Sequence, residues 1–226
     1  MGSLANPLNR PVRRVVSTPV FSLPRAALSG FQQPIKRVTD ILLSAVGLLL
    51  LSPALAIVAF IIKLESPGPI IFRQTRLGLH GVAFKIYKFR TMHVWEDGGD
   101  VRQASRKDAR VTRVGLWLRK TSVDELPQVV NVLKGDMSLV GPRPHALAHD
   151  LYYGELLPEY SIRQTVRPGL TGWAQVNGNR GETPTIDRMA QRLTFDLWYI
   201  HHWSEGLDIE IMWRTLVQLL KAPNAY

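Results

Sequence analysis

An uncharged apolar run from Ile41 to Ile62, interrupted by Ser52-Pro53, constrains this chain more than any other feature. A helix needs about 20 apolar residues to cross the hydrocarbon core of a bilayer, so the run is long enough. Proline lacks an amide hydrogen and its ring clashes with the preceding turn, so Pro53 interrupts the hydrogen-bond ladder where lipid offers no substitute. Length alone favours an ordinary spanning helix.

Basic residues on both sides of the run favour a different topology. Lys36 and Arg37 precede it, while Lys63, Arg73 and Arg76 follow it. Because positive charge is normally kept on the cytoplasmic side, a segment that is basic at both ends has no preferred direction of crossing. A re-entrant helix, which bends at the proline and leaves by the face it entered, fits both observations. The serine before the proline can bond a carbonyl freed by the break. These residues leave the two topologies nearly equal.

Charge and composition limit the possible partners. The net charge is +10, and residues 1–37 contribute six basic residues and no acid, which suits an anionic membrane surface. Aromatic residues are not interleaved with this basic tail as a base-stacking surface requires, so we expect no nucleic-acid partner. The chain has no cysteine, which excludes disulfides, thiolate metal sites and thiol nucleophiles.

The remaining pattern predicts a mostly helical α/β domain. We divide the chain into a basic flexible leader (1–35), a membrane segment (36–64), a cytosolic domain (65–221) and a tail (222–226). Two short strands are expected near residues 70–74 and 84–90, with helices over 114–120, 126–133, 146–157, 185–203 and 207–221. One face of the last helix carries Ile209, Met212, Trp213, Leu216 and Leu220. Such a stripe suits either a core or the headgroup zone of a membrane.

The densest group of reactive side chains surrounds Asp124 and Glu125. Ser122 and Glu125 have the spacing of a helix capping box, which favours a structural role. Pro127 would clash within that helix, so the helix is expected to start later and to leave the acids on an outward-facing turn. The functional interpretation is that one carboxylate attacks a phosphorus atom whose charge is neutralised by cations or a metal.

Several cations are candidates for binding phosphate. Arginine presents a forked set of donors that suits a diphosphate, and the candidates are Arg90, Arg119, Arg143 and Arg167. The most specific are Arg143, between two prolines, and Arg167, before Pro-Gly, because rigid bends fix where a side chain begins. His145 and His149 have a metal-binding spacing but no evident third ligand, so we interpret them as surface histidines.

These motifs, taken in order, resemble those of the bacterial polyprenyl-phosphate sugar-1-phosphate transferases, the monotopic phosphoglycosyltransferase superfamily. The resemblance runs from about residue 36 to residue 220. Its blocks are Ser52-Pro53 and residues 88–92, 121–128, 131–138, 140–144 and 167–178. Residues 180–183 and 196–200 resemble the hexose-1-phosphate branch that starts exopolysaccharide, capsule or O-antigen synthesis. The usual Asn-Gly-Arg-Asn block reads Asn177-Gly178-Asn179-Arg180 here, so no role is transferred to positions 179 and 180.

The resemblance implies a re-entrant helix broken at Ser52-Pro53, with amphipathic interfacial helices and a catalytic domain on the cytoplasmic face of the bacterial inner membrane. It implies the short form, without the multi-span region of larger members. Asp124 would attack the β-phosphate of a UDP-hexose, glucose or galactose being preferred, and release UMP. Undecaprenyl phosphate would then accept the phosphosugar.

Further roles follow from the same resemblance. Mg²⁺ would bind Asp124 and the diphosphate, and Glu125 would assist. Phosphate contacts would come from Lys88, Arg90, Arg119, Arg143 and Arg167. A homodimer is plausible from family membership. Two alternatives are a non-catalytic basic membrane adaptor and a membrane-spanning transferase that uses a ternary complex.

Overall fold

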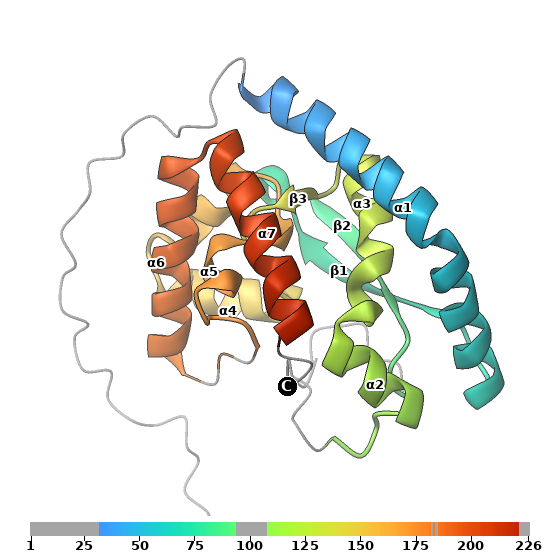
Figure 1. Ribbon diagram of the computed structural model, residues 1–226. Coiled ribbons are helices and arrows are strands. Elements are labelled where there is room, and N and C mark those ends of the chain that lie inside the picture. The colour runs from blue at the N-terminus through green and yellow to red at the C-terminus, as the bar shows by residue number, and fades with distance from the viewer. Residues whose placement is uncertain (1–31, 94–107, 182, 184, 222–226) are drawn as a thin grey trace, which may run out of the picture.

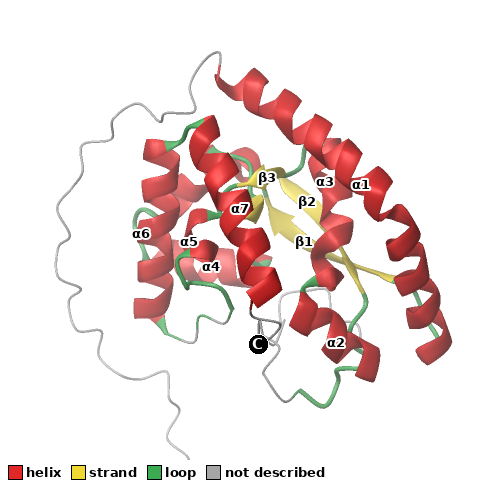
Figure 2. Ribbon diagram, viewed as in Figure 1, coloured by secondary structure: helices red, strands yellow, loops and turns green. Residues whose placement is uncertain are grey.

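The computed structural model describes residues 32–93, 108–181, 183 and 185–221, and it is mostly helical (Figures 1 and 2). The helices are α1 (Gln32–Glu65), α2 (Arg113–Thr121), α3 (Val129–Lys134), α4 (Leu147–Leu156), α5 (Trp173–Val176), α6 (Ile186–His202) and α7 (Glu205–Lys221). Short 3₁₀ turns are η1 (Leu79–Gly81), η2 (Val123–Gln128) and η3 (Tyr160–Thr165). The strands are β1 (Ile71–Leu77), β2 (Ala83–Phe89), β3 (Ser138–Val140) and β4 (Gly169–Thr171). The predicted leader up to residue 31 and the tail lie outside the described residues.

Helix α1 continues without interruption through Pro53. The expected helix-break-helix is therefore wrong as secondary structure. The expected compensation is confirmed, because the Ser52 hydroxyl donates to the Leu49 carbonyl at 2.9 Å. In a regular helix that carbonyl accepts from the amide four residues later, which is Pro53 and has no hydrogen. A local side-chain bond thus keeps the helix intact where its ladder lacks a donor.

The N-terminal half of α1 is fixed to the domain by polar contacts. Arg37 donates to the carbonyls of Val132 and Leu133 at the end of α3. Asp40, 4% exposed, accepts from the Leu139 amide at 2.9 Å and from the Ser138 hydroxyl at 3.1 Å. Charge at a helix end and satisfied buried polar groups make this a specific attachment.

The C-terminal half of α1 is held by apolar packing. Val58 and Ile62 pack with Phe89 of β2 and Leu118 of α2, all of them buried. Helix α1 therefore lies along one edge of the domain, as Figure 1 shows, and contacts it near both ends. The outward side is apolar and uncovered, with Leu49 and Leu50 about three-quarters exposed. By length and composition, this helix is able to cross a membrane.

The predicted hairpin is confirmed. Strands β1 and β2 pair antiparallel, from Ile71 opposite Phe89 to Leu77 opposite Ala83. Buried Ile86 and Phe89 anchor β2 in separate apolar clusters, while Lys88 points toward the acidic pair on η2. The hairpin thus presents a cation to η2 from a rigid support.

A second, parallel pairing joins β3 to β4 and was not predicted. It brings the two proline-containing bends together, because Gly141 N donates to Thr171 O and Gly169 N donates to Pro142 O, both at 2.9 Å. A Cβ atom at Gly169 would lie only 2.1 Å from the Gly141 nitrogen, so this approach requires glycine. The pairing fixes the backbone on which Arg143 begins.

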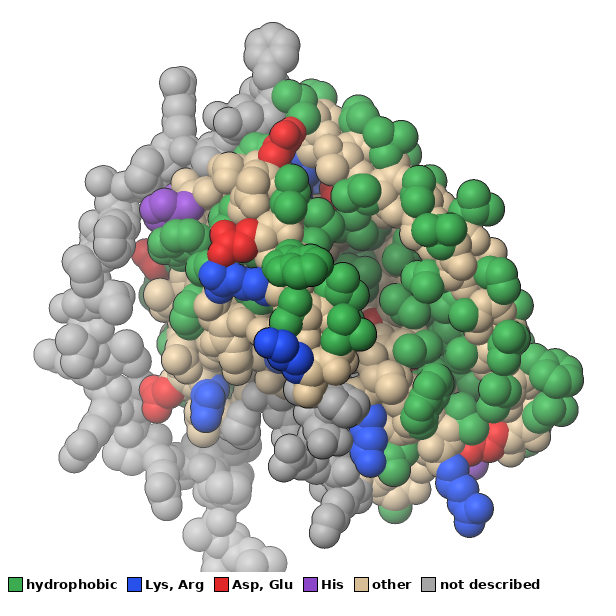
Figure 3. All heavy atoms as spheres, viewed as in Figure 1, with side chains coloured by type: hydrophobic (Ala, Val, Ile, Leu, Met, Phe, Trp, Pro, Cys, Tyr) green, Lys and Arg blue, Asp and Glu red, His purple; other side chains and the backbone are tan. Residues whose placement is uncertain are grey.

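Helices α6 and α7 cover the other side of the domain. Tyr199, Ile200 and Ile211 are almost wholly buried and pack against Val140 of β3. The apolar stripe on α7 faces outward instead, since Trp213 is 64% exposed and Leu220 is 76% exposed. The core interpretation of that stripe is wrong. Figure 3 shows apolar side chains gathered over α7 and along α1 on one face of the molecule.

Candidate active site

The acidic pair lies on η2, between two helices. Helix α2 ends where Ser122 adopts a left-handed conformation (φ 59°), and α3 begins only at Val129, after Pro127. The predicted late helix start is confirmed. The capping box is wrong, because Ser122 makes no capping bond and its hydroxyl accepts from Arg180 at 2.5 Å.

Asp124 and Glu125 do not face outward as predicted. They are only 8% and 7% exposed. Burying two adjacent carboxylates is costly unless cations or hydrogen bonds compensate them, so their surroundings decide what each one can do.

Glu125 is fully engaged by cations. Lys88 Nζ lies 2.8 Å from Oε1, and the Arg143 guanidinium donates to both carboxylate oxygens, with Nη1 at 2.9 Å from Oε2. Burial alone would raise the pKa of Glu125, but Arg143 and Lys88 outweigh it and hold that pKa well below its usual value. Glu125 is therefore an ionised group that keeps two cations in position.

The pKa of Asp124 is shifted in the opposite direction. The described residues supply no hydrogen-bond donor to its carboxylate. Burial, and then the negative charge of Glu125, raise its pKa to about 6, against attraction from Lys88, Arg119 and Arg143. A buried carboxylate that is ionised near neutral pH, with free oxygens and cations nearby, has the properties of a nucleophile.

Two more arginines border this pair. Arg119 uses Nε to bond the Thr91 hydroxyl at 2.9 Å, and its two terminal nitrogens have no acceptor among the described residues. Arg180 arrives from a loop 58 residues further along the chain and contacts Ser122. No role was predicted for Arg180, since its block departs from the usual order. Lys88, Arg119 and Arg143 are thus the predicted phosphate ligands that the fold brings to the acidic pair.

Arg90 is committed elsewhere. Its guanidinium donates to the carbonyls of Ser66 and Pro67, at 2.7 and 2.6 Å, and to the Ser66 hydroxyl at 2.9 Å. Arg90 is 8% exposed and joins β2 to the turn that follows α1. This arrangement is a structural attachment and does not support the predicted phosphate contact.

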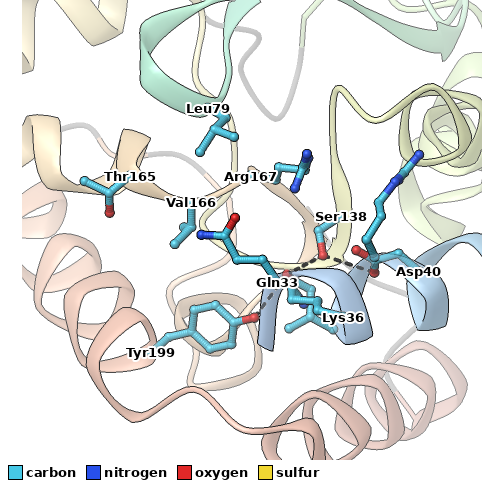
Figure 4. A pocket seen from close by; sticks show the side chains of 11 residues that line it. Gln33, Lys36, Asp40, Leu79, Ser138, Thr165, Val166, Arg167 and Tyr199 are labelled. Atoms are coloured by element: carbon cyan, nitrogen blue, oxygen red, sulfur yellow. Dashed lines mark hydrogen bonds between the residues drawn. The ribbon is translucent and has the colours of Figure 1, made fainter. Parts of the chain in front are cut away.

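Arg167 is likewise directed away from the acidic pair. Its Nε donates to the Gly135 carbonyl at 3.0 Å, beyond the end of α3. Figure 4 shows its side chain at a small cavity beside the start of α1, together with Gln33, Lys36, Ser138 and Tyr199. The cavity volume is about 30 Å³, which is room for only a few water molecules.

A second buried polar cluster lies behind Arg143 and was missed. His145, interpreted as a surface residue, is 7% exposed and bonds Tyr160 and Arg192. Burial and then the nearby arginines hold its pKa well below the usual value, so it is neutral. The sequence signal was the position of His145 directly after a rigid Pro-Arg-Pro bend.

The acidic pair can offer a magnesium ion only one free carboxylate. The described residues form no cluster of three or more His, Asp or Glu side chains able to hold a metal. Mg²⁺, however, commonly takes one or two carboxylates and completes its shell with substrate phosphates and water. With Glu125 already engaged, Asp124 is the free protein ligand for such a site.

Comparisons with known proteins bear on this geometry. Residues 31–222 match the family described as bacterial sugar transferase. An Escherichia coli protein named UDP-glucose:undecaprenyl-phosphate glucose-1-phosphate transferase is 50% identical over 98% of this chain and 48% of its own length. A Caulobacter vibrioides protein of that name is 58% identical over 84% of this chain and 72% of its length. A Rhizobium leguminosarum exopolysaccharide production protein is 47% identical over 82% of this chain and 95% of its own length. The chain thus spans about half the length of the E. coli relative.

Proposed function

This chain belongs to the bacterial sugar transferase family, and we propose that it transfers glucose-1-phosphate from UDP-glucose to undecaprenyl phosphate. The single observation that carries the proposal is that two adjacent carboxylates differ in their surroundings. Asp124 has free oxygens and ionises near neutral pH, whereas Glu125 is engaged by Lys88 and Arg143. The choice of glucose rests on the names of the E. coli and Caulobacter relatives.

The reaction proceeds in two displacements at phosphorus. An Oδ atom of Asp124 attacks the β-phosphorus of UDP-glucose, and the bond to the bridging oxygen breaks, so that UMP leaves with that oxygen. A phosphate oxygen of the lipid acceptor then attacks the same phosphorus. The acyl-phosphate bond breaks, and the Asp124 carboxylate is regenerated. The two substrates thus need not occupy the site together.

The cations around the pair stabilise charge that moves during these steps. Arg119, whose terminal nitrogens face no described acceptor, is the proposed ligand of the donor diphosphate. Lys88 and Arg143 remain on Glu125 and supply positive charge next to Asp124. Glu125 keeps these two cations in position beside Asp124.

We include Mg²⁺ in this proposal. Asp124 would hold the ion, with diphosphate oxygens and water completing its shell. When bound, the ion neutralises diphosphate charge and makes UMP a better leaving group. The residues themselves orient the donor and keep one carboxylate free to react.

The membrane arrangement that we propose is monotopic, with the domain on the cytoplasmic face of the inner membrane. Both halves of α1 contact one domain, through Asp40 at one end and Ile62 at the other, which supports a helix whose two ends stay on the same side of the membrane. The exposed apolar residues of α7 would lie in the headgroup zone beside α1. A homodimer remains a prediction from the resemblance alone.

The test is UMP release by the purified full chain in detergent or nanodiscs, with Mg²⁺, undecaprenyl phosphate and a panel of UDP-sugars. We expect UDP-glucose to give the highest rate. Release of UMP without the lipid, together with a phosphohexose adduct in intact-protein mass spectra, supports the two-step route. UMP release that strictly requires the lipid, with no adduct, supports a ternary complex instead. No UMP from any donor supports the adaptor interpretation.

A further inference from the structure

Arg163 on η3 lies at the centre of the buried cluster behind the acidic pair, although it contacts neither Asp124 nor Glu125. It is 6% exposed. Its Nε donates to Asp196 of α6 at 2.8 Å, and its guanidinium lies 5.0 Å from the centre of the Tyr160 ring. Asp196, 2% exposed, supplies the opposite charge that so deeply buried a cation requires.

One remaining donor of Arg163 reaches the backbone of Arg143. Nη2 lies 2.6 Å from the Arg143 carbonyl oxygen. Arg143 stands between Pro142 and Pro144, whose rings restrict the backbone on both sides. The hydrogen bond adds a fixed point from outside the bend, so the Arg143 side chain begins from an immobilised position.

Arg163 also contacts His145, two residues after Arg143. Arg163 Nη1 lies 3.1 Å from His145 Nδ1, and Arg192 Nη1 lies 3.1 Å from His145 Nε2. The Tyr160 hydroxyl also contacts His145 Nδ1, and it donates to Asp150 at 2.8 Å. These contacts make Arg163 part of a connected buried network, and its bond to the Arg143 carbonyl links that network to the Pro-Arg-Pro bend.

We propose that Arg163 is a positioning residue for the transfer reaction, because it holds the Arg143 carbonyl and so directs the Arg143 guanidinium onto Glu125. This inference rests on the proposed function for its catalytic meaning, although its structural part does not. Arg163 is not a catalytic residue, since its effect passes through Arg143. A displacement of about 1 Å at Glu125 would change how Lys88 and Arg143 face Asp124, and such displacements cost on the order of 10²-fold in rate.

The kinetic test is a double-mutant cycle between Arg163→Lys and Arg143→Lys. Lysine at position 163 keeps a charge for Asp196 but loses the fork that reaches the Arg143 carbonyl. We expect Arg163→Lys to lower kcat for UMP release by about 10- to 100-fold, with little change in KM for the donor. In the Arg143→Lys background the same change should lower kcat less than about twofold. Equal losses in both backgrounds would overturn the proposal.

Arg192→Lys is the matched control. Arg192 is a similarly buried arginine of the same network, and its recorded bonds go to His145 and the Gly181 carbonyl, not to Arg143. Its effect on kcat should therefore be equal with and without Arg143→Lys. If Arg163→Lys does not fold, Arg163→Gln with Asp196→Asn replaces it, because this neutral pair leaves no buried charge alone.

A second measurement separates this inference from the proposed function. Arginine side-chain NMR of the full chain in nanodiscs, assigned with Arg143→Lys, reports whether the Arg143 guanidinium is immobilised on Glu125. We expect slowly exchanging, resolved Nη signals in the unmodified protein and in Arg192→Lys, and their loss in Arg163→Lys. Their persistence in Arg163→Lys contradicts the inference even if the protein proves inactive. Absence of UMP release from the unmodified protein contradicts only the proposed function.

Discussion

The guanidinium of Arg143 donates to both carboxylate oxygens of Glu125, 18 residues earlier in the chain. This fork gives two adjacent acids different chemical states. Glu125 is held ionised, and its charge then helps to raise the pKa of Asp124 to about 6. In the proposed reaction this contrast leaves the oxygens of Asp124 available to attack phosphorus.

We expect Asp124→Asn to abolish UMP release and adduct formation, with a loss of at least about 10³-fold, because the amide cannot act as the nucleophile. Asp187→Asn, at an exposed acid in the first turn of α6, is the control and should change the rate little. UMP assays and intact-protein mass spectra make the comparison. Normal turnover in Asp124→Asn removes the proposed nucleophile.

The same substitution should stabilise the fold at neutral pH. The pKa of Asp124 is raised in the folded state, so its contribution to stability is present below pH 3.8 and is lost as the pH rises through about 6. Asparagine carries no such cost at pH 7. We expect a higher unfolding temperature for Asp124→Asn than for the unmodified chain at pH 7, and no difference near pH 4.

The rate of the first step should depend on pH through Asp124. Because the proposed attacking group is the ionised carboxylate, single-turnover UMP release should fall as the pH drops through about 6 and be about tenfold lower at pH 5 than on its plateau. A bound cation favours the anion, so raising the Mg²⁺ concentration should move the midpoint lower. A flat profile between pH 5 and 7 at limiting Mg²⁺ contradicts this assignment.

Substitutions of Arg90 and Arg119 should distinguish a structural arginine from a substrate-binding one. Arg90→Lys loses several bonds to the turn after α1, so we expect the free energy of unfolding to fall by about 1–3 kcal/mol while KM for the donor stays constant. Arg119→Lys loses a fork at the diphosphate, so KM or kcat should worsen about tenfold or more with little change in stability. Denaturant unfolding and steady-state kinetics on the same preparations decide between the two roles.

The path of α1 can be measured with single cysteines, since the chain has none of its own. Gln33→Cys and Val82→Cys should react with a membrane-impermeant maleimide from the same side of oriented vesicles. Leu50→Cys, in the uncovered apolar part of the helix, should stay unreacted until detergent is added. Labelling of positions 33 and 82 from opposite sides rules out a monotopic arrangement.

Ser52→Ala tests the bond that replaces the missing amide donor at Pro53. We expect the free energy of unfolding in nanodiscs to fall by about 1 kcal/mol, because the Leu49 carbonyl loses the hydroxyl donor that replaces the missing Pro53 amide. Ser44→Ala is the comparison, since the Ser44 hydroxyl is buried in the same helix and has no partner among the described residues. Equal effects of the two changes would show that the Ser52 bond has no special weight.

Local patterns were enough to predict much of the fold. The hairpin, the late start of α3 and the extents of α6 and α7 follow from alternation, from Pro127 and from helical periodicity. The parallel pairing of β3 with β4 was not accessible, because each strand has three residues and their pairing depends on segments about 30 residues apart. The sequence left open whether the apolar stripe of α7 is buried, since the same pattern is expected for a helix that packs on a core and for one that lies against lipid.

The sequence predicted which residues gather at the site better than it predicted their contacts. A capping box is a local pattern, and it was wrong because Glu125 finds cations on β2 and in the Pro-Arg-Pro bend, which only the tertiary fold brings to it. Among the four candidate arginines, the rigid bends favoured Arg143 and Arg167 equally. Their acceptors then separated them, with Arg90 and Arg167 bonded to main-chain carbonyls and Arg143 to a carboxylate.

The start of α1 is tied to a residue near the far end of the chain. Lys36 forms an ion pair with Asp208, which also accepts from Tyr199 at 2.8 Å. During synthesis the ribosome must therefore add 172 further residues before that pair can form. The attachment of the first helix to α7 is therefore one of the last contacts of the fold to become available during translation.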